Sequence, residues 1–165
     1  MILFISPYII HAIIFFWDEF YFHYKRGLAL WELIGHPIDT LSTALCLLFV
    51  QTMPFSEGAL LSYCGLLILS CLSVSKDEAV HYKLCSPTEM WLHSLLFLLH
   101  PILLLLPVCI WSLRSHPFLQ QFLGLSPEVV LWNYWFIWGI LALTIGVLLY
   151  QLISLALFHT QAQKR

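Results

Sequence analysis

The sequence predicts an all-α integral membrane protein with about five transmembrane helices, four of which form a bundle built from an internal two-helix repeat. The composition is the first reason, because 61% of the 165 residues are hydrophobic and only 10% are charged. In soluble domains, about 45–50% of the residues are hydrophobic and about 25% are charged. The mean hydropathy is +0.87. The other reasons are the long apolar runs joined by short polar turns, and a polar pattern that occurs twice.

Charge and cysteine usage exclude two classes of function. The seven Lys and Arg residues are outnumbered by nine Asp and Glu residues. No nucleic-acid partner is therefore expected, since phosphate binding needs a basic surface. The five cysteines form no CxxC pair and lie mostly in apolar runs. Such cysteines behave as small hydrophobic residues, so a thiol-redox enzyme is not expected either.

The first two spans are read from apolar length, because a helix needs about 20 apolar residues to cross a membrane. The first helix is expected over about 2–24, and the turn Lys25-Arg26-Gly27 follows it. The second is expected over about 29–53, where Pro54 ends it. A start at Pro37 is the alternative for this helix, since proline favours the first helical turn.

The remaining spans carry clear start signals. The third helix is expected over about 57–82. The fourth begins at Ser86-Pro87-Thr88-Glu89, where a cap, a first-turn proline and a capping-box acid stand in order, and it runs to about Leu113. The fifth follows Ser126-Pro127-Glu128 and covers about 128–160. It is expected to complete the bundle wall or one side of a substrate groove, and residues 1–165 form a single transmembrane domain.

The distribution of Lys and Arg predicts the orientation. In a five-span arrangement, Arg114 falls on one side of the membrane and the remaining basic residues fall on the other. The positive-inside rule makes that richer side cytoplasmic, so the N-terminus is expected outside and the C-terminus in the cytoplasm. The basic residues of the cytoplasmic side are Lys25, Arg26, Lys76, Lys83, Lys164 and Arg165.

A polar pattern repeats across the ends of consecutive helices. Each copy has an Asp-Glu pair, then His-Tyr-Lys, a turn, and Glu-x-x-x-His. The repeats are expected over about 1–54 and about 57–114, related by an axis along the membrane normal, with about 128–160 as an extra helix. The first copy contains Asp18, Glu19, His23, Tyr24, Lys25, Glu32 and His36, and the second contains Asp77, Glu78, His81, Tyr82, Lys83, Glu89 and His93.

This pattern predicts a metal site near the cytoplasmic face. Residues four apart share a helix face, and carboxylates and imidazoles are ligands of zinc, iron and manganese. Two of the candidate acids could instead have structural roles. Glu89 could be the acid of a capping box, and Asp39 could be a first-turn acid if the second helix starts at Pro37. Adjacent acids differ by about 100° around a helix, so which of each Asp-Glu pair faces the site is left open. The candidate ligands are Asp18, Glu19, His23, Glu32, His36, Asp39, Asp77, Glu78, His81, Glu89, His93 and His100.

In ligand chemistry alone, this set resembles the di-iron and di-manganese carboxylate bundles, which take Glu and Glu-x-x-His ligands from four helices. Glu78-x-x-His81 matches that spacing. The resemblance implies two metal ions per chain. The ligand set favours iron, because it is rich in carboxylate and imidazole and has no plausible thiolate except Cys85, and zinc or manganese are the alternatives. In a two-metal site, Glu32 and Glu89 are the expected bridging ligands, because the repeat axis relates them.

A metal layer just beneath the head groups suits chemistry on a membrane lipid or lipid-like substrate. The expected function is a metal-dependent oxidoreductase that uses a redox partner. A zinc-dependent lipid hydrolase is the first alternative, since zinc-bound water is a nucleophile. A proton or metal-ion transporter is the second, because such proteins also bury acids and histidines in a helix bundle. A non-catalytic accessory subunit is the third.

Overall fold

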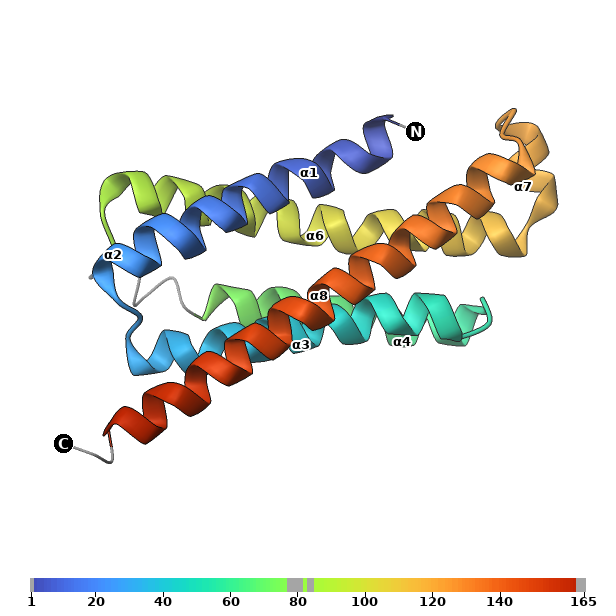
Figure 1. The fold of residues 1–165 in the computed structure, drawn as a ribbon. Coiled ribbons are helices and arrows are strands. Elements are labelled where there is room, and N and C mark those ends of the chain that lie inside the picture. The colour runs from blue at the N-terminus through green and yellow to red at the C-terminus, as the bar shows by residue number, and fades with distance from the viewer. Residues whose placement is uncertain (1, 77–81, 83–84, 163–165) are drawn as a thin grey trace.

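A computed structural model describes residues 2–76, 82 and 85–162, and in these residues the regular secondary structure is all helical, with no strand (Figure 1). Helix accounts for 90% of the structure. The predicted all-α fold class is confirmed. The count of five spans and the internal repeat stay predictions.

The N-terminal helical run contains a change of helix type. The α-helix α1 (Ile2–Trp17) continues directly into the π-helix η1 (Asp18–His23) and the short α2 (Tyr24–Arg26). Gly27 ends the run with a φ of 76°, a left-handed conformation that glycine adopts without a Cβ clash. The sequence predicted the extent of this helix but not the π-helical turn within it.

Helix α3 (Leu30–Thr52) begins beside Ala29, so the predicted range of about 29–53 is confirmed and the alternative start at Pro37 is wrong. Pro37 lies inside the helix. Helix α4 (Glu57–Ser75) starts where expected, with the Ser56 hydroxyl accepting a hydrogen bond from the Ala59 N–H. The rest of its predicted range, beyond Lys76, lies almost entirely outside the described residues.

The C-terminal half adds two long helices and one short helix. Helix α6 (Pro87–Ser115) starts at the predicted capping box, and helix α8 (Pro127–Ala162) starts at the predicted proline. Between them lies the short helix α7 (Pro117–Phe122), which was not predicted from the sequence. Its first residue is Pro117, which has the fixed φ that suits a first helical turn.

The long helices form a bundle in which the chain direction alternates. Helix α3 packs against α4, α6 and α8, and α1 packs against α6. In Figure 1, the starts of α3 and α6 and the end of α8 lie at one end of the bundle, close to α2. Helix α8 crosses α3 obliquely in this view. Side chains from η1 and from the starts of α3 and α6 can therefore meet inside the bundle.

Four helices, α3, α4, α6 and α8, are long and apolar enough to cross a membrane, which suggests an integral membrane protein. Helix α1, with 16 residues, is shorter than these spans, so a fifth span stays a prediction. The orientation of the termini also stays a prediction.

The polarity of the bundle is inverted relative to a soluble protein. Large apolar side chains such as Leu61, Leu69 and Leu143 are exposed on its surface, as expected of a lipid-facing wall. The apolar core, which includes Leu47, Leu104 and Ile137, occupies the end of the bundle near the α3–α4 connection. The opposite end holds the buried acidic and histidine side chains Asp18, Glu19, His23, Glu32, Glu89 and His93.

Candidate metal centre

The π-helix η1 places three ionisable side chains inside the bundle. Asp18, Glu19 and His23 are all buried. A π-helix has i→i+5 hydrogen bonds and a wider turn than an α-helix, so a residue faces its fifth neighbour more closely. His23 accordingly contacts both Asp18, five residues before it, and Glu19, four residues before it. Both members of the first Asp-Glu pair face inward. In an ideal α-helix only one of two adjacent acids would be expected to face the site, and the sequence left open which one.

Helix α6 contributes its first-turn acid and the histidine one turn later. The Glu89 carboxylate Oε2 accepts a hydrogen bond of 3.2 Å from the Ser86 N–H, and the Ser86 hydroxyl accepts one of 3.3 Å from the Glu89 N–H. The capping role of Glu89 is therefore confirmed. The cap also holds Glu89 at the site, since it is buried and lies among the candidate ligands.

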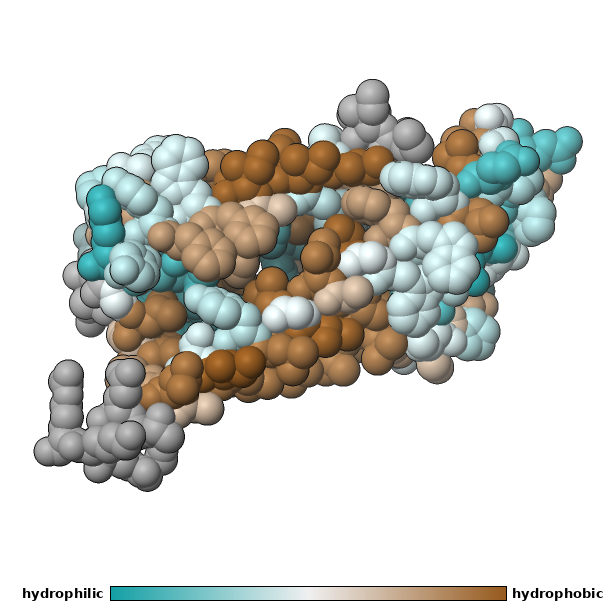
Figure 2. Space-filling model, in the orientation of Figure 1, coloured by the Kyte–Doolittle hydropathy of each residue, from teal (hydrophilic) through white to brown (hydrophobic). Residues whose placement is uncertain are grey.

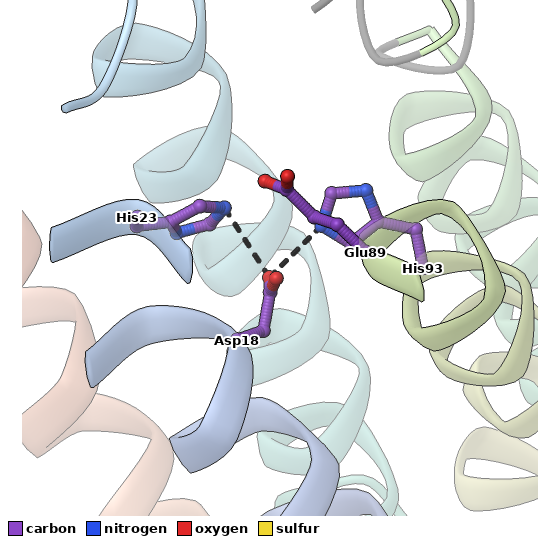
Figure 3. A group of neighbouring side chains, drawn as sticks. All are labelled: Asp18, His23, Glu89 and His93. Atoms are coloured by element: carbon purple, nitrogen blue, oxygen red, sulfur yellow. Dashed lines mark hydrogen bonds and ion pairs between the residues drawn. The ribbon is translucent and has the colours of Figure 1, made fainter. Parts of the chain in front are cut away.

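Asp18, His23, Glu89 and His93 form a compact buried cluster (Figure 3). Each offers one ligand atom, and these atoms lie within 4.8 Å of one another. The Asp18 Oδ2 atom lies 3.0 Å from His93 Nε2 and 3.3 Å from His23 Nε2. Two imidazoles and a carboxylate thus converge from η1 and α6, with the Glu89 carboxylate beside them.

Glu19, His23 and His36 form a second group that shares His23. The His23 Nδ1 atom lies 3.0 Å from Glu19 Oε2, and the rings of His23 and His36 stack with centroids 5.1 Å apart. A neutral imidazole has one N–H and one lone pair. If Nδ1–H donates to Glu19, the Nε2 lone pair of His23 points to the first cluster. Glu19 then acts as the carboxylate that orients a metal-binding histidine.

The cluster has the unsatisfied atoms that a cation would satisfy. Asp18 Oδ1 is buried, and among the described groups it has no hydrogen-bond partner. His23 Nε2 likewise makes no well-oriented hydrogen bond within the described part of the chain, although it lies 3.3 Å from a carboxylate oxygen. A lone pair facing a carboxylate at this distance needs a proton or a metal between the two atoms. Ligands about 2.0–2.2 Å from a metal lie roughly 3.0–3.5 Å from their neighbours, which matches both Asp18 contacts.

Three predicted ligands make other contacts. The buried Glu32 carboxylate accepts a hydrogen bond of 2.9 Å from the Ala29 N–H. Asp39 accepts hydrogen bonds from Lys76 Nζ at 2.7 Å and the Ser73 hydroxyl at 2.6 Å. His100 Nε2 lies 2.9 Å from the Ser70 hydroxyl. Among the described residues, none of these three predicted ligands, Glu32, Asp39 and His100, belongs to either group, and their role as ligands stays a prediction.

The structure describes only part of the second copy of the repeat. Asp77, Glu78 and His81 lie outside the described residues. Glu89 and His93 of this copy join Asp18 and His23 of the first copy. The symmetric two-metal arrangement, including the bridging role of Glu32 and Glu89, stays a prediction.

A cavity of about 320 Å³ extends from the cluster into the bundle, between α1, α3, α6 and α8. Asp18, Glu19, His23 and His93 lie at one end of it. Gln151 was not predicted as a site residue, although its side chain is buried and lines the same cavity. A glutamine within a long apolar run is a signal that was available in the sequence.

Comparisons with protein-family models, curated proteins and solved structures find no match.

Proposed function

We propose that Asp18, His23, Glu89 and His93 bind a transition-metal ion, with iron favoured, and that the protein is an oxidoreductase acting on a lipidic substrate. The convergence of two histidine Nε2 atoms on Asp18 Oδ2, beside the unpartnered Asp18 Oδ1, is the observation that carries this proposal within the described structure. A metal at that position would satisfy all of these atoms.

The ligand types favour iron. Two histidines and one or two carboxylates are the ligand set of non-haem iron oxygenases, which leave positions open for other ligands. The two groups formed by the described residues contain no cysteine ligand, whereas zinc and copper(I) sites commonly use thiolates. Bound iron would supply oxygen activation. The overall reaction favoured here inserts one oxygen atom into a C–H bond and releases the other as water, using two electrons and two protons from a redox partner.

The side chains around the cluster position and isolate the site. Glu19 orients the His23 ring, and the Ser86 cap fixes Glu89. Burial of these side chains keeps bulk water from the metal position, so that a substrate rather than solvent occupies the open side. A second metal, which the duplication predicts, would draw on Asp77, Glu78 or His81.

A single-turnover experiment tests the reaction class. Detergent-solubilised protein is loaded with iron(II) without oxygen, mixed with membrane lipids and one two-electron equivalent of a chemical reductant in place of the redox partner, and exposed to oxygen. Mass spectrometry should then detect lipids that have gained one oxygen atom, and the His93→Ala variant should form none. Ester or amide cleavage by the zinc-loaded protein, with no oxidation by the iron-loaded protein, would instead indicate a zinc-dependent hydrolase.

A further inference from the structure

The cavity beside the cluster has one polar end and mainly apolar walls. Its polar end is lined by Asp18, His23 and His93 of the cluster, together with Glu19 and Gln151. The walls deeper in the bundle come from Ala12, Phe15, Ile140 and Val147 together with other apolar residues. At about 320 Å³, the cavity lies within the range of ligand-binding pockets, which are roughly 300–1,000 Å³.

The polar side chains deeper in the cavity already have partners in the protein. The Tyr8 hydroxyl donates to the Leu103 carbonyl at 2.8 Å. The hydroxyls of Thr43 and Thr144 donate to backbone carbonyls of their own helices at 2.9 Å and 2.8 Å. His100 is hydrogen-bonded to the Ser70 hydroxyl. His11 and Thr40 also line the cavity, but most of the residues around its deeper part are apolar. This part of the cavity therefore suits an alkyl chain.

The unsatisfied polar atoms lie at the cluster end. Asp18 and Gln151 are lining residues of the cavity, and within the described structure their buried atoms Oδ1 and Oε1 have no hydrogen-bond partner. Leaving such an atom unpaired costs about 1–3 kcal/mol. A metal can satisfy Asp18, but the neutral Gln151 carbonyl is a hydrogen-bond acceptor. It is complementary to a ligand group that donates an O–H or N–H.

The cavity opens between α1 and α8. The rings of Tyr8 and Phe136 meet with centroids 5.5 Å apart, and those of Phe20 and Tyr150 meet with centroids 6.2 Å apart. Between these two contacts, Phe16 and Leu143 line the cavity and are also 55% and 69% exposed. Figure 2 shows a hollow on this face, with hydrophobic side chains around its rim and hydrophilic ones behind them.

The length of the cavity matches a lipid chain in one leaflet. On α8 the lining runs from Ile140 to Gln151, which is about 16 Å at about 1.5 Å per residue. A bilayer's hydrocarbon core is about 30 Å thick, so the cavity extends over roughly half of it. Leu143 belongs to a helix that is apolar enough to cross the membrane, so the opening faces the lipid chains.

We propose that this cavity binds a single-chain lipid that enters from the membrane between α1 and α8, with its chain along α8 and a hydrogen-bond-donating polar group at Gln151. A long-chain alcohol, amine or amide has this chemistry, whereas an ionised carboxylate has no O–H or N–H to donate. As the substrate class of the oxidoreductase, this lipid rests on the proposed function. Binding itself requires no metal.

Photo-crosslinking of the full-length protein in phosphatidylcholine vesicles tests the binding site. The probe is a long-chain fatty alcohol with a diazirine in its chain, and labelled peptides are mapped by mass spectrometry. Labelling at Phe15, Phe16 and Leu143 should saturate and should fall at least ten-fold when unlabelled fatty alcohol is added in excess. The proposal would be overturned if labelling did not saturate and occurred wherever side chains are exposed on the surface, for example at Leu61 and Leu69.

Two variants and a control make the test specific. Ala12→Trp fills the cavity beside its opening and should reduce saturable labelling at least ten-fold. Ala142→Trp adds the same side chain at an exposed position of α8 that does not line the cavity, and should label like the wild type. Gln151→Leu keeps a similar volume without the carbonyl and should weaken binding of the fatty alcohol but not of the corresponding alkane. Equal labelling of the wild type, Ala12→Trp and Gln151→Leu would overturn the proposal.

Metal content, measured on the same samples, separates the two proposals. Saturable labelling of a protein that binds no metal would contradict the proposed metal site and support the proposed lipid site. A metal-loaded protein with non-saturable labelling would overturn the lipid site alone.

Discussion

Asp18 in η1 and His93 in α6 are 75 residues apart in the chain, yet the Oδ2 atom of one lies 3.0 Å from the Nε2 atom of the other. The contact follows from the antiparallel packing of α1 on α6. The same register brings the Tyr8 hydroxyl to the Leu103 carbonyl, deeper in the bundle. One helix pair thus sets both the metal cluster and the far end of the cavity.

The two buried histidines of α6 provide a direct test of the ligand set. His93→Ala should reduce metal content by at least ten-fold, because it removes an Nε2 ligand from the cluster. His100→Ala is the comparison variant, because His100 is a predicted ligand that the structure places outside both groups. It removes a buried histidine two turns along the same helix, whose Nε2 is hydrogen-bonded to Ser70. Metal content is measured by mass spectrometry of the elements, and equal loss in both variants would contradict the assignment.

Glu19 is predicted to act through His23. Glu19→Gln should weaken metal binding by about 10–100-fold without abolishing it, because the amide oxygen can still accept the Nδ1–H hydrogen bond but lacks the negative charge. Metal titration of the purified variant gives its dissociation constant. Asp18→Asn, which changes a ligand rather than its partner, should cause the larger loss. The reverse order would assign the metal to the Glu19, His23 and His36 group.

The contacts of Asp39 favour a role in stabilising the fold over the ligand role that the sequence pattern predicts. Its carboxylate is held by Lys76 and Ser73, and both charged side chains are largely buried. Asp39→Ala leaves Lys76 without this partner and should lower the free energy of unfolding by about 1–3 kcal/mol. Thermal unfolding and metal analysis of one preparation test both statements. A stable variant that has lost its metal would make Asp39 a ligand, as the sequence pattern indicates.

Metal removal should destabilise the protein, since a ligand that binds only the folded state adds to its stability. At a free metal concentration about 100 times the dissociation constant, the gain is about 2.7 kcal/mol. A chelator should therefore lower the unfolding temperature of the wild type, and adding iron(II) should restore it. The His93→Ala variant should show neither effect. An identical response in both proteins would indicate that iron acts elsewhere.

Much of the fold could be predicted because its signals are local. The start of α6 follows from Ser86, Pro87 and Glu89, and the start of α3 beside Ala29 follows from the length of its apolar run. The short helix α7 was missed because its six residues carry too little periodicity to distinguish a helix from a turn. The π-helix was missed for a different reason. An extra residue in a helical turn leaves no compositional trace.

The sequence predicted the kinds of residues at the candidate site better than it predicted how they are arranged in space. The repeated acids and histidines predicted twelve candidate ligands in one layer, and the structure brings four of them, Asp18, His23, Glu89 and His93, together. The sequence could not show that Asp18 and Glu19 both face His23, because that depends on the π-helical turn. Nor could it indicate that Lys76 would pair with Asp39 or Ser70 with His100, since such pairs depend on how α3, α4 and α6 pack together.

The decisive measurement is elemental analysis of detergent-purified wild-type protein by inductively coupled plasma mass spectrometry. We expect at least one transition-metal ion per chain, with iron the most abundant, and near-complete loss in the His93→Ala variant. Two ions per chain would support the second site that the duplication predicts. A well-folded protein that contains no metal and binds neither iron(II), manganese(II) nor zinc(II) when these are added would contradict the metal site.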